Sequence, residues 1–156
     1  AAIPGSPRTM VLLAPIGSVY QAGTLSGNPV ATAAGLATLE LCDENLYSSL
    51  NIRAREVGAV VSDALSHEGV AHRLQSAGNL FSIFFADREV RTFADAQGQD
   101  TQAFAAFFHS MLDNGVSLPP SAYEAWFVSG AHTERDVEVI ASAARIAAKT
   151  AAKING

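Results

Sequence analysis

Residues 44–68 read ENLYSSLNIRAREVGAVVSDALSHE, and this stretch sets the fold class. Apolar residues recur along it at spacings of three and four, which is the period of an α-helix. They are Leu46, Leu50, Ala54, Val57, Val61 and Leu65. Gly69 follows directly and is typical of a helix C-terminus. We therefore predict one long helix over 44–68 that links two parts of the fold.

Downstream of this helix the pattern alternates between short strands and helices. The predicted elements are strand 70–75, a hairpin turn at 76–78, strand 79–86, a polar excursion at 87–100, helix 101–113, strands 116–118 and 125–128, and a last helix capped by Thr133. Two adjacent apolar strands with a Gly-containing turn are typical of a hairpin. The order predicts an α+β layout, an antiparallel sheet covered by helices on one face.

Upstream, Asn28 and Pro29 are favoured at the N-cap and first position of a helix, so we expect a helix from Pro29 to Leu41. It is apolar nearly all round, which predicts burial. Residues 1–7 are rich in Pro, Gly and Ser and are expected to form a loop. The predicted organisation is a remnant of a larger domain at 1–43, a linking helix at 44–68 and a small domain at 69–156.

The composition excludes several classes of protein. The chain has 156 residues, of which 49% are hydrophobic and 16% charged, with a formal net charge of −5. This predicts a folded protein, and the scattered Lys and Arg residues form no nucleic-acid footprint. No apolar run reaches the roughly 18 residues of a membrane span, and the first residues lack the features of a signal peptide. We therefore expect a cytoplasmic protein without nucleic-acid or membrane partners.

Cysteine and histidine offer little chemistry. Cys42 is the single cysteine, which excludes a disulfide within the chain, and its apolar neighbours predict a buried, inert thiol. The four histidines have no metal-ligand spacing, so no metal site is predicted.

The segment 23–29, GTLSGNP, is the strongest candidate for ligand binding. Gly23 and Gly27 allow a ligand close to the backbone, and Thr24 and Ser26 offer hydroxyl donors. The helix that follows presents unpaired N–H groups and a partial positive charge, which suit an anion such as phosphate. The alternative is a tight turn with a polar N-cap, and the residues alone leave both interpretations open.

Glu124 is the second candidate, because it lies in an otherwise apolar stretch, YEAWFV at 123–128. A carboxylate there is either exposed on a loop or kept near the core by a functional role, since burial of an unpaired charge is costly.

Three segments carry a resemblance to a known family. They are YQAGTLSGNP at 20–29, AGNLF at 77–81 and PPSAYEAWFVS at 119–129. From about Val11 to its end the chain is similar to the C-terminal part of glutamate-1-semialdehyde 2,1-aminomutases. The ten residues of the first segment are specific to that family, whereas other class III aminotransferases share only its Thr-x-x-Gly-Asn-Pro part.

The resemblance implies the C-terminal small domain of a fold-type-I enzyme that uses pyridoxal 5'-phosphate or pyridoxamine 5'-phosphate. Such enzymes are homodimers, and they move the amino group of an amino-acid substrate between neighbouring carbons to give 5-aminolevulinate for tetrapyrrole synthesis. By this resemblance Thr24 binds the cofactor phosphate of the neighbouring subunit. Tyr20 and Gly23 match residues of the same site, and Glu124 matches a carboxylate that faces it.

One departure from the family is decisive for activity. The family's cofactor lysine precedes the first segment, whereas this sequence has only Lys149 and Lys153, and neither matches it. We therefore expect the chain alone to be inactive. The alternatives are a part of another class III aminotransferase, or a non-catalytic dimerisation or binding module.

Overall fold

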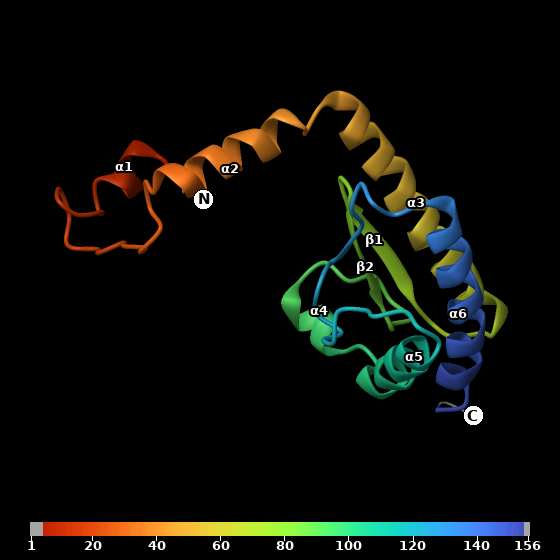
Figure 1. The fold of residues 1–156 in the computed structure, drawn as a ribbon. Helices are drawn as coiled ribbons and strands as arrows, with labels where there is room; N and C mark the ends of the chain where they lie inside the picture. Colours follow the sequence, from red (N-terminus) through yellow and green to blue (C-terminus); the bar gives the residue numbers. More distant parts are fainter. Residues whose placement is uncertain (1–4, 155–156) are drawn as a thin grey trace. The chain divides into compact units, whose positions relative to one another are not determined.

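The computed structural model describes residues 5–154, which divide into two compact units between Cys42 and Asp43. The first unit contains helices α1 (Pro7–Met10) and α2 (Pro29–Glu40). The second contains an antiparallel sheet and the helices α3 to α6 (Figure 1). The predicted long helix thus belongs to the second unit, while the three-part division of the chain stays a prediction.

Helix α3 (Glu44–His67) confirms the predicted long helix. Asp43 caps its start by accepting a hydrogen bond from the Leu46 N–H at 2.8 Å. At its end Gly69 adopts a φ of 70°, and the Val70 N–H donates to the Leu65 carbonyl at 2.9 Å. This left-handed residue and six-to-one hydrogen bond form a Schellman motif, which stops the helix and turns the chain toward the sheet.

The sheet has the order β1-β2-β3, with β1 (Arg73–Ala77), β2 (Leu80–Phe84) and β3 (Trp126–Phe127). β1 and β2 are joined by a two-residue turn whose first residue, Gly78, has a φ of 65°. A positive φ at that position is typical of a hairpin turn that matches the twist of the strands. The predicted hairpin is therefore confirmed, with its turn shifted toward the C-terminus.

The predicted strand at 116–118 is wrong. Val116 uses its N–H to bond the Met111 carbonyl at 2.9 Å, which ends the preceding helix, and so the segment joins no ladder. Its apolar side chains Val116 and Leu118 nevertheless pack against the core, which explains why the segment resembles a strand in sequence.

One face of the sheet is covered by helices, as predicted. Phe81, Ile83 and Trp126 point to this face and are buried with the apolar stripe of α3 and with α6 (Glu134–Ala152). The other face is only partly covered, because Leu80 and Phe127 remain exposed there.

The segment predicted as a polar excursion is structured. It contains a short helix, α4 (Phe93–Gln97), that begins with a capping box between Thr92 and Asp95. Ala86, Val90 and Ala96 pack with Phe84 into a small separate cluster on the second face of the sheet. The few apolar residues of this polar stretch therefore suffice to fold it onto the sheet.

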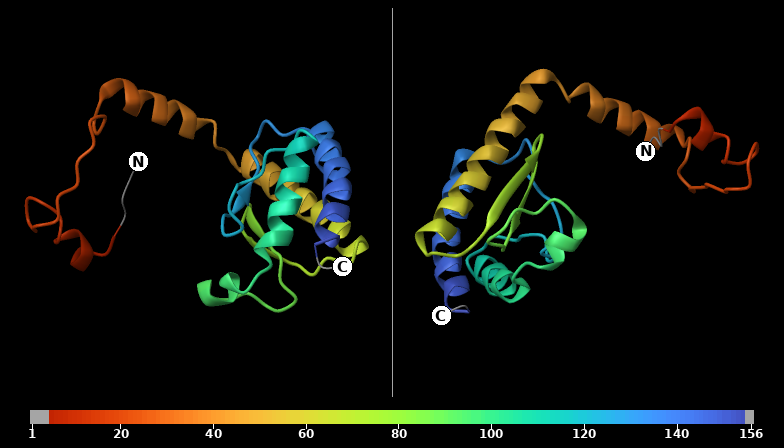
Figure 2. Two further views of the ribbon diagram at one scale, coloured as in Figure 1. Left: turned by 90° about the horizontal axis from the view of Figure 1, so that it is seen from below. Right: turned by 180° about the vertical axis from the view of Figure 1, so that it is seen from behind.

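Helices α5 (Thr101–Asp113) and α6 lie side by side, and α6 also packs along α3 (Figure 2). Phe104, Phe107 and Met111 of α5 are buried. Leu112 would be expected to point inward because it is apolar, but its side chain is 47% exposed. The buried stripe follows 104, 107 and 111, which leaves 112 on the outer side of the helix.

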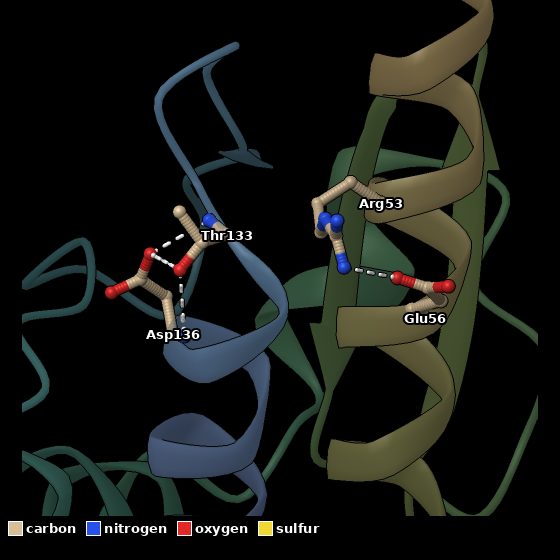
Figure 3. Close-up of polar contacts among 4 residues, drawn as sticks. All are labelled: Arg53, Glu56, Thr133 and Asp136. Atoms are coloured by element: carbon tan, nitrogen blue, oxygen red, sulfur yellow. Dashed lines mark hydrogen bonds and ion pairs between the residues drawn. The ribbon is translucent and has the colours of Figure 1, made fainter.

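Thr133 caps α6, as predicted, and forms a capping box with Asp136 (Figure 3). The Asp136 carboxylate accepts hydrogen bonds from the Thr133 N–H and hydroxyl, both at 2.7 Å. These bonds, the backbone one first, lower the pKa of Asp136. The stabilisation is therefore complete above the ordinary carboxyl pKa and is lost as the pH falls through the lowered one. The ion pair Arg53–Glu56 in the same figure is partly exposed and contributes little.

Helix α2 has no buried residue, which contradicts the prediction that it is a buried helix. Leu36, Leu39 and Leu41 are all exposed, because no residue among 5–154 covers them. The predicted burial of Cys42 is also wrong, as this residue is half-buried and its thiol donates to the Thr38 carbonyl at 3.3 Å. Of the predicted loop at 1–7, residues 1–4 lie outside the described residues, and Ser6 caps α1.

We expect Phe107→Ala to lower the free energy of unfolding of the 156-residue chain by about 3–5 kcal/mol, because Phe107 is completely buried at the centre of the core. Leu112→Ala, further along the same helix at a position that is about half exposed, should cost less than about 1 kcal/mol. Urea unfolding measures both. Equal losses would contradict the assignment of the buried face of α5.

Candidate functional site

The segment 23–29 forms two successive turns. The Ser26 N–H donates to the Gly23 carbonyl at 3.0 Å, and the Asn28 N–H donates to the Leu25 carbonyl at 3.1 Å. A Cβ at Gly23 would stand 2.9 Å from the Ser26 hydroxyl oxygen, and Gly27 has a φ of 72°. The backbone path itself therefore requires glycine at 27, whereas a Cβ at Gly23 would only make the Ser26 hydroxyl rotate away.

The side chain of Asn28 accepts hydrogen bonds from two N–H groups at the start of α2. Its Oδ1 accepts hydrogen bonds from Val30 N at 3.0 Å and Ala31 N at 3.1 Å. The prediction of unpaired N–H groups at this helix start is therefore wrong for these two, because the N-cap side chain satisfies them. The partial positive charge of the helix end remains, and it still favours an anion nearby.

The predicted phosphate-binding residues are accessible. Tyr20, Gly23 and Thr24 are all exposed, and the Tyr20 side chain has 81% of its surface in contact with solvent. Within residues 5–154 the hydroxyls of Thr24 and Ser26 make no hydrogen bond. The segment thus presents free hydroxyl donors next to the positive end of a helix.

Glu124 is exposed and lies in a tight turn, Ser121–Glu124, directly before β3. Its carboxylate Oε2 accepts a hydrogen bond from the Ser121 N–H at 3.0 Å, and its own N–H donates to the Ser121 carbonyl at 3.2 Å. The carboxylate is therefore held in a defined position on the surface of the second unit. Whether it faces the cofactor site stays a prediction, since Tyr20, Gly23 and Thr24 belong to the first unit.

Ser129 and His132 form a hydrogen-bonded pair at the N-terminal side of α6. The Ser129 hydroxyl lies 3.0 Å from His132 Nδ1, and the Ser129 N–H donates to the same nitrogen at 3.1 Å. Because this ring nitrogen already accepts from the backbone, the pair is a local turn closure and no nucleophile–base pair of a hydrolase.

Lys149 lies on the exposed side of α6, and Lys153, which caps the end of that helix, is also exposed. Among residues 5–154 no group of three or more His, Cys, Asp or Glu side chains is arranged to hold a metal ion. None of the helices within that range combines the length and the apolar character needed to cross a membrane.

The structure also reveals a residue that the sequence analysis missed. Gln99 is buried, and its side-chain amide donates to the Ala122 carbonyl within the turn that bears Glu124. The sequence around Gln99 gives no sign that this residue is buried, because its hydrogen-bond partner Ala122 is 23 positions away.

Comparison with known proteins relates this chain to one enzyme family. It is 50% identical over 155 residues to a glutamate-1-semialdehyde 2,1-aminomutase of Cutibacterium acnes, which covers 99% of this chain and 36% of that protein. It is 52% identical over 153 residues to the enzyme of the same name from Propionibacterium freudenreichii subsp. freudenreichii, with coverages of 98% and 35%. The chain matches the C-terminal part of glutamate-1-semialdehyde 2,1-aminomutases. It thus spans about a third of the length of these aminomutases, and no family model matches it.

Solved structures show the same fold. An omega-transaminase from Sphaerobacter thermophilus matches with a TM-score of 0.72 and 24% identity, over 94% of this chain and 34% of that one. A structure described as a transaminase with PLP bound matches with a TM-score of 0.72 and 19% identity, over 96% and 34%. These matches confirm the α+β fold that the resemblance to the aminomutases implied.

Proposed function

We propose that this chain is the C-terminal part of a pyridoxal-phosphate enzyme that converts glutamate-1-semialdehyde to 5-aminolevulinate in tetrapyrrole synthesis. The observation that carries the proposal is the identity of about half of all positions, over nearly the whole chain, to aminomutases of that name. We further propose that the complete enzyme is a cytoplasmic homodimer.

The uncovered surface of the first unit supports this proposal. Helix α2 is apolar, yet none of its residues is buried within residues 5–154. A contiguous exposed apolar surface marks a place where other protein packs. The upstream two thirds of an aminomutase chain, or its partner subunit, supplies that cover.

The residues present fit one end of the proposed cofactor. Thr24 has a hydroxyl without a partner among residues 5–154, Gly23 leaves the backbone bare, and the positive end of α2 follows. These groups suit a phosphate. When bound, pyridoxal phosphate withdraws electrons from the carbon that carries the amino group.

Each residue has a role in this proposal. Thr24 donates a hydrogen bond to the phosphate across the subunit interface, and Gly23 and Tyr20 line the same site. Glu124, fixed by its bond from Ser121, presents a carboxylate to the substrate amine and accepts or returns a proton there. The cofactor lysine comes from the upstream part of the enzyme.

The fold similarity to transaminases favours a second candidate, a part of another class III aminotransferase. That enzyme uses the same cofactor but moves the amino group to a second substrate. Adding glutamate-1-semialdehyde alone to the complete enzyme separates the two, because only an aminomutase forms 5-aminolevulinate without an amino acceptor. A non-catalytic dimerisation or binding module would form none under any condition.

We expect the 156-residue chain alone to form no 5-aminolevulinate. Lys149 on α6 and Lys153 just after it are exposed, and neither matches the family's cofactor lysine, which precedes Tyr20. A colorimetric assay of the product, with and without added pyridoxal phosphate, tests this, and turnover by the chain would overturn it.

In the complete enzyme we expect Thr24→Ala to weaken retention of pyridoxal phosphate by about tenfold to a hundredfold. The reason is that a hydrogen bond to a charged group contributes about 1.5–3 kcal/mol. Dissociation followed by absorbance measures this loss. Thr38→Ala is the matched control, because among residues 5–154 the Thr38 hydroxyl bonds only the Ala34 carbonyl of the same helix. Equal dissociation constants for wild type and Thr24→Ala would remove Thr24 from the site.

We expect Glu124→Gln in the complete enzyme to reduce kcat by roughly a hundredfold, the usual contribution of a general acid or base. Folding should be intact, because the amide oxygen still accepts the bond from the Ser121 N–H. Glu138→Gln, an exposed carboxyl on α6, is the control. Normal turnover by Glu124→Gln would mean that Glu124 is an ordinary surface residue.

A further inference from the structure

Gln99 is the buried polar residue of the core among residues 5–154, with 6% of its surface exposed. Its side-chain Nε2 donates to the Ala122 carbonyl at 3.1 Å. Its Oε1 accepts from the Phe85 N–H at 3.4 Å. A buried amide that is satisfied at both ends acts as a crosslink, since losing either bond leaves a buried polar group unpaired.

One end of this crosslink is fixed on the sheet. Phe85 directly follows β2, and its carbonyl accepts a hydrogen bond from the Asp100 N–H at 2.8 Å. Asp100 in turn caps α5 by accepting from the N–H groups of Gln102 and Ala103. The backbone of Gln99 is therefore held between the end of a strand and the start of a helix.

The other end reaches the turn Ser121–Glu124. Elsewhere this turn is held from outside by weaker contacts. The Ser82 hydroxyl donates to the Glu124 carbonyl at 3.4 Å, and the rings of Phe93 and Tyr123, both exposed, lie 5.7 Å apart. The hydrogen bond from Gln99 is partly buried, and its acceptor, the Ala122 carbonyl, is two residues before Glu124.

We propose that Gln99 is a positioning residue that sets the place of the Glu124 carboxylate by clamping its turn to the sheet. This rests on the proposed role of Glu124 in turnover. The carboxylate is bound to the Ser121 N–H of the same turn, so a shift of the turn moves the carboxylate with it. A displacement of about 1 Å at a reacting group can cost roughly a hundredfold in rate.

The clamp itself is tested by amide hydrogen exchange of the 156-residue chain, measured by NMR. In Gln99→Met the side chain keeps its length but loses both bonds, and the protection factors of the Ser121 and Glu124 amides should fall by about tenfold or more. Gln75→Met is the matched control, because the Gln75 side chain also donates from the sheet to a backbone carbonyl, but to that of Val90 rather than to a residue of the turn. Unchanged protection in Gln99→Met overturns the clamp.

A second variant guards against misfolding of the first. In Gln99→Glu the introduced carboxyl keeps an acceptor for the Phe85 N–H but can donate to the Ala122 carbonyl only when protonated. Relative to wild type at the same pH, protection of the Ser121 amide should therefore be low at neutral pH and recover as the pH falls through the titration of that carboxyl. A pH-independent protection factor contradicts the proposal.

The effect on turnover is tested in the complete enzyme by a double-mutant cycle. Gln99→Met should lower kcat by about tenfold or more with little change in KM, and it should have no further effect in the Glu124→Gln background. Additive effects would show that Gln99 acts independently of Glu124 and would overturn the positioning role.

The two proposals fail in different ways. If Glu124→Gln turns over normally while Gln99→Met loses protection, the proposed role of Glu124 is wrong and the clamp is only structural. If Glu124→Gln is slow but Gln99→Met keeps both its protection and its kcat, Glu124 is functional and the positioning role is wrong.

Discussion

The second unit depends on how closely α3 approaches the sheet. At the crossing stands Gly58, where a Cβ would lie 3.2 and 3.3 Å from the two methyl groups of Leu74 and 3.7 Å from the Phe81 ring. That spacing is tighter than most Cβ contacts, so a side chain at 58 would make Leu74 shift, and glycine lets the helix and the strands approach this closely. Val57 and Val61 on either side are then placed at the depth where they join Phe81 in one core.

The same sheet positions the candidate functional groups of this unit. β2 runs through the core and is followed directly by Phe85, to which Gln99 and Asp100 both bond. β3 pairs with β2 at Phe81 and Leu80, and the turn with Glu124 directly precedes it. The exposed carboxylate of Glu124 is thereby connected to the core in two ways, along the chain into β3 and through the side-chain amide of Gln99.

Local signals in the sequence predicted the elements that local physics controls. The stripe of α3, the Gly69 stop and the box of Thr133 with Asp136 all depend on neighbours within four residues, and all are confirmed. The predicted strand at 116–118 is wrong, and α4 was not predicted within the polar excursion. In both segments the conformation depends on packing against distant parts of the chain. Apolar α2 was expected to be buried, but its cover is not among residues 5–154. Asn28 was recognised as a cap, yet its consequence for the helix N–H groups was overlooked.

Helix α6 meets its neighbours through alanines, with Ala144, Ala147, Ala148 and Ala151 wholly inaccessible to solvent and Ala143 nearly so. An alanine surface has no rotamers to lose, so ordering it costs little entropy. Its side chains are single methyl groups that can hardly be made smaller. Any added methylene must push α6 away from α3 and α5. The two sides of this helix therefore tolerate substitution differently. The outer side can vary in size and charge. A change on the inner side disrupts the packing of α3, α5 and α6.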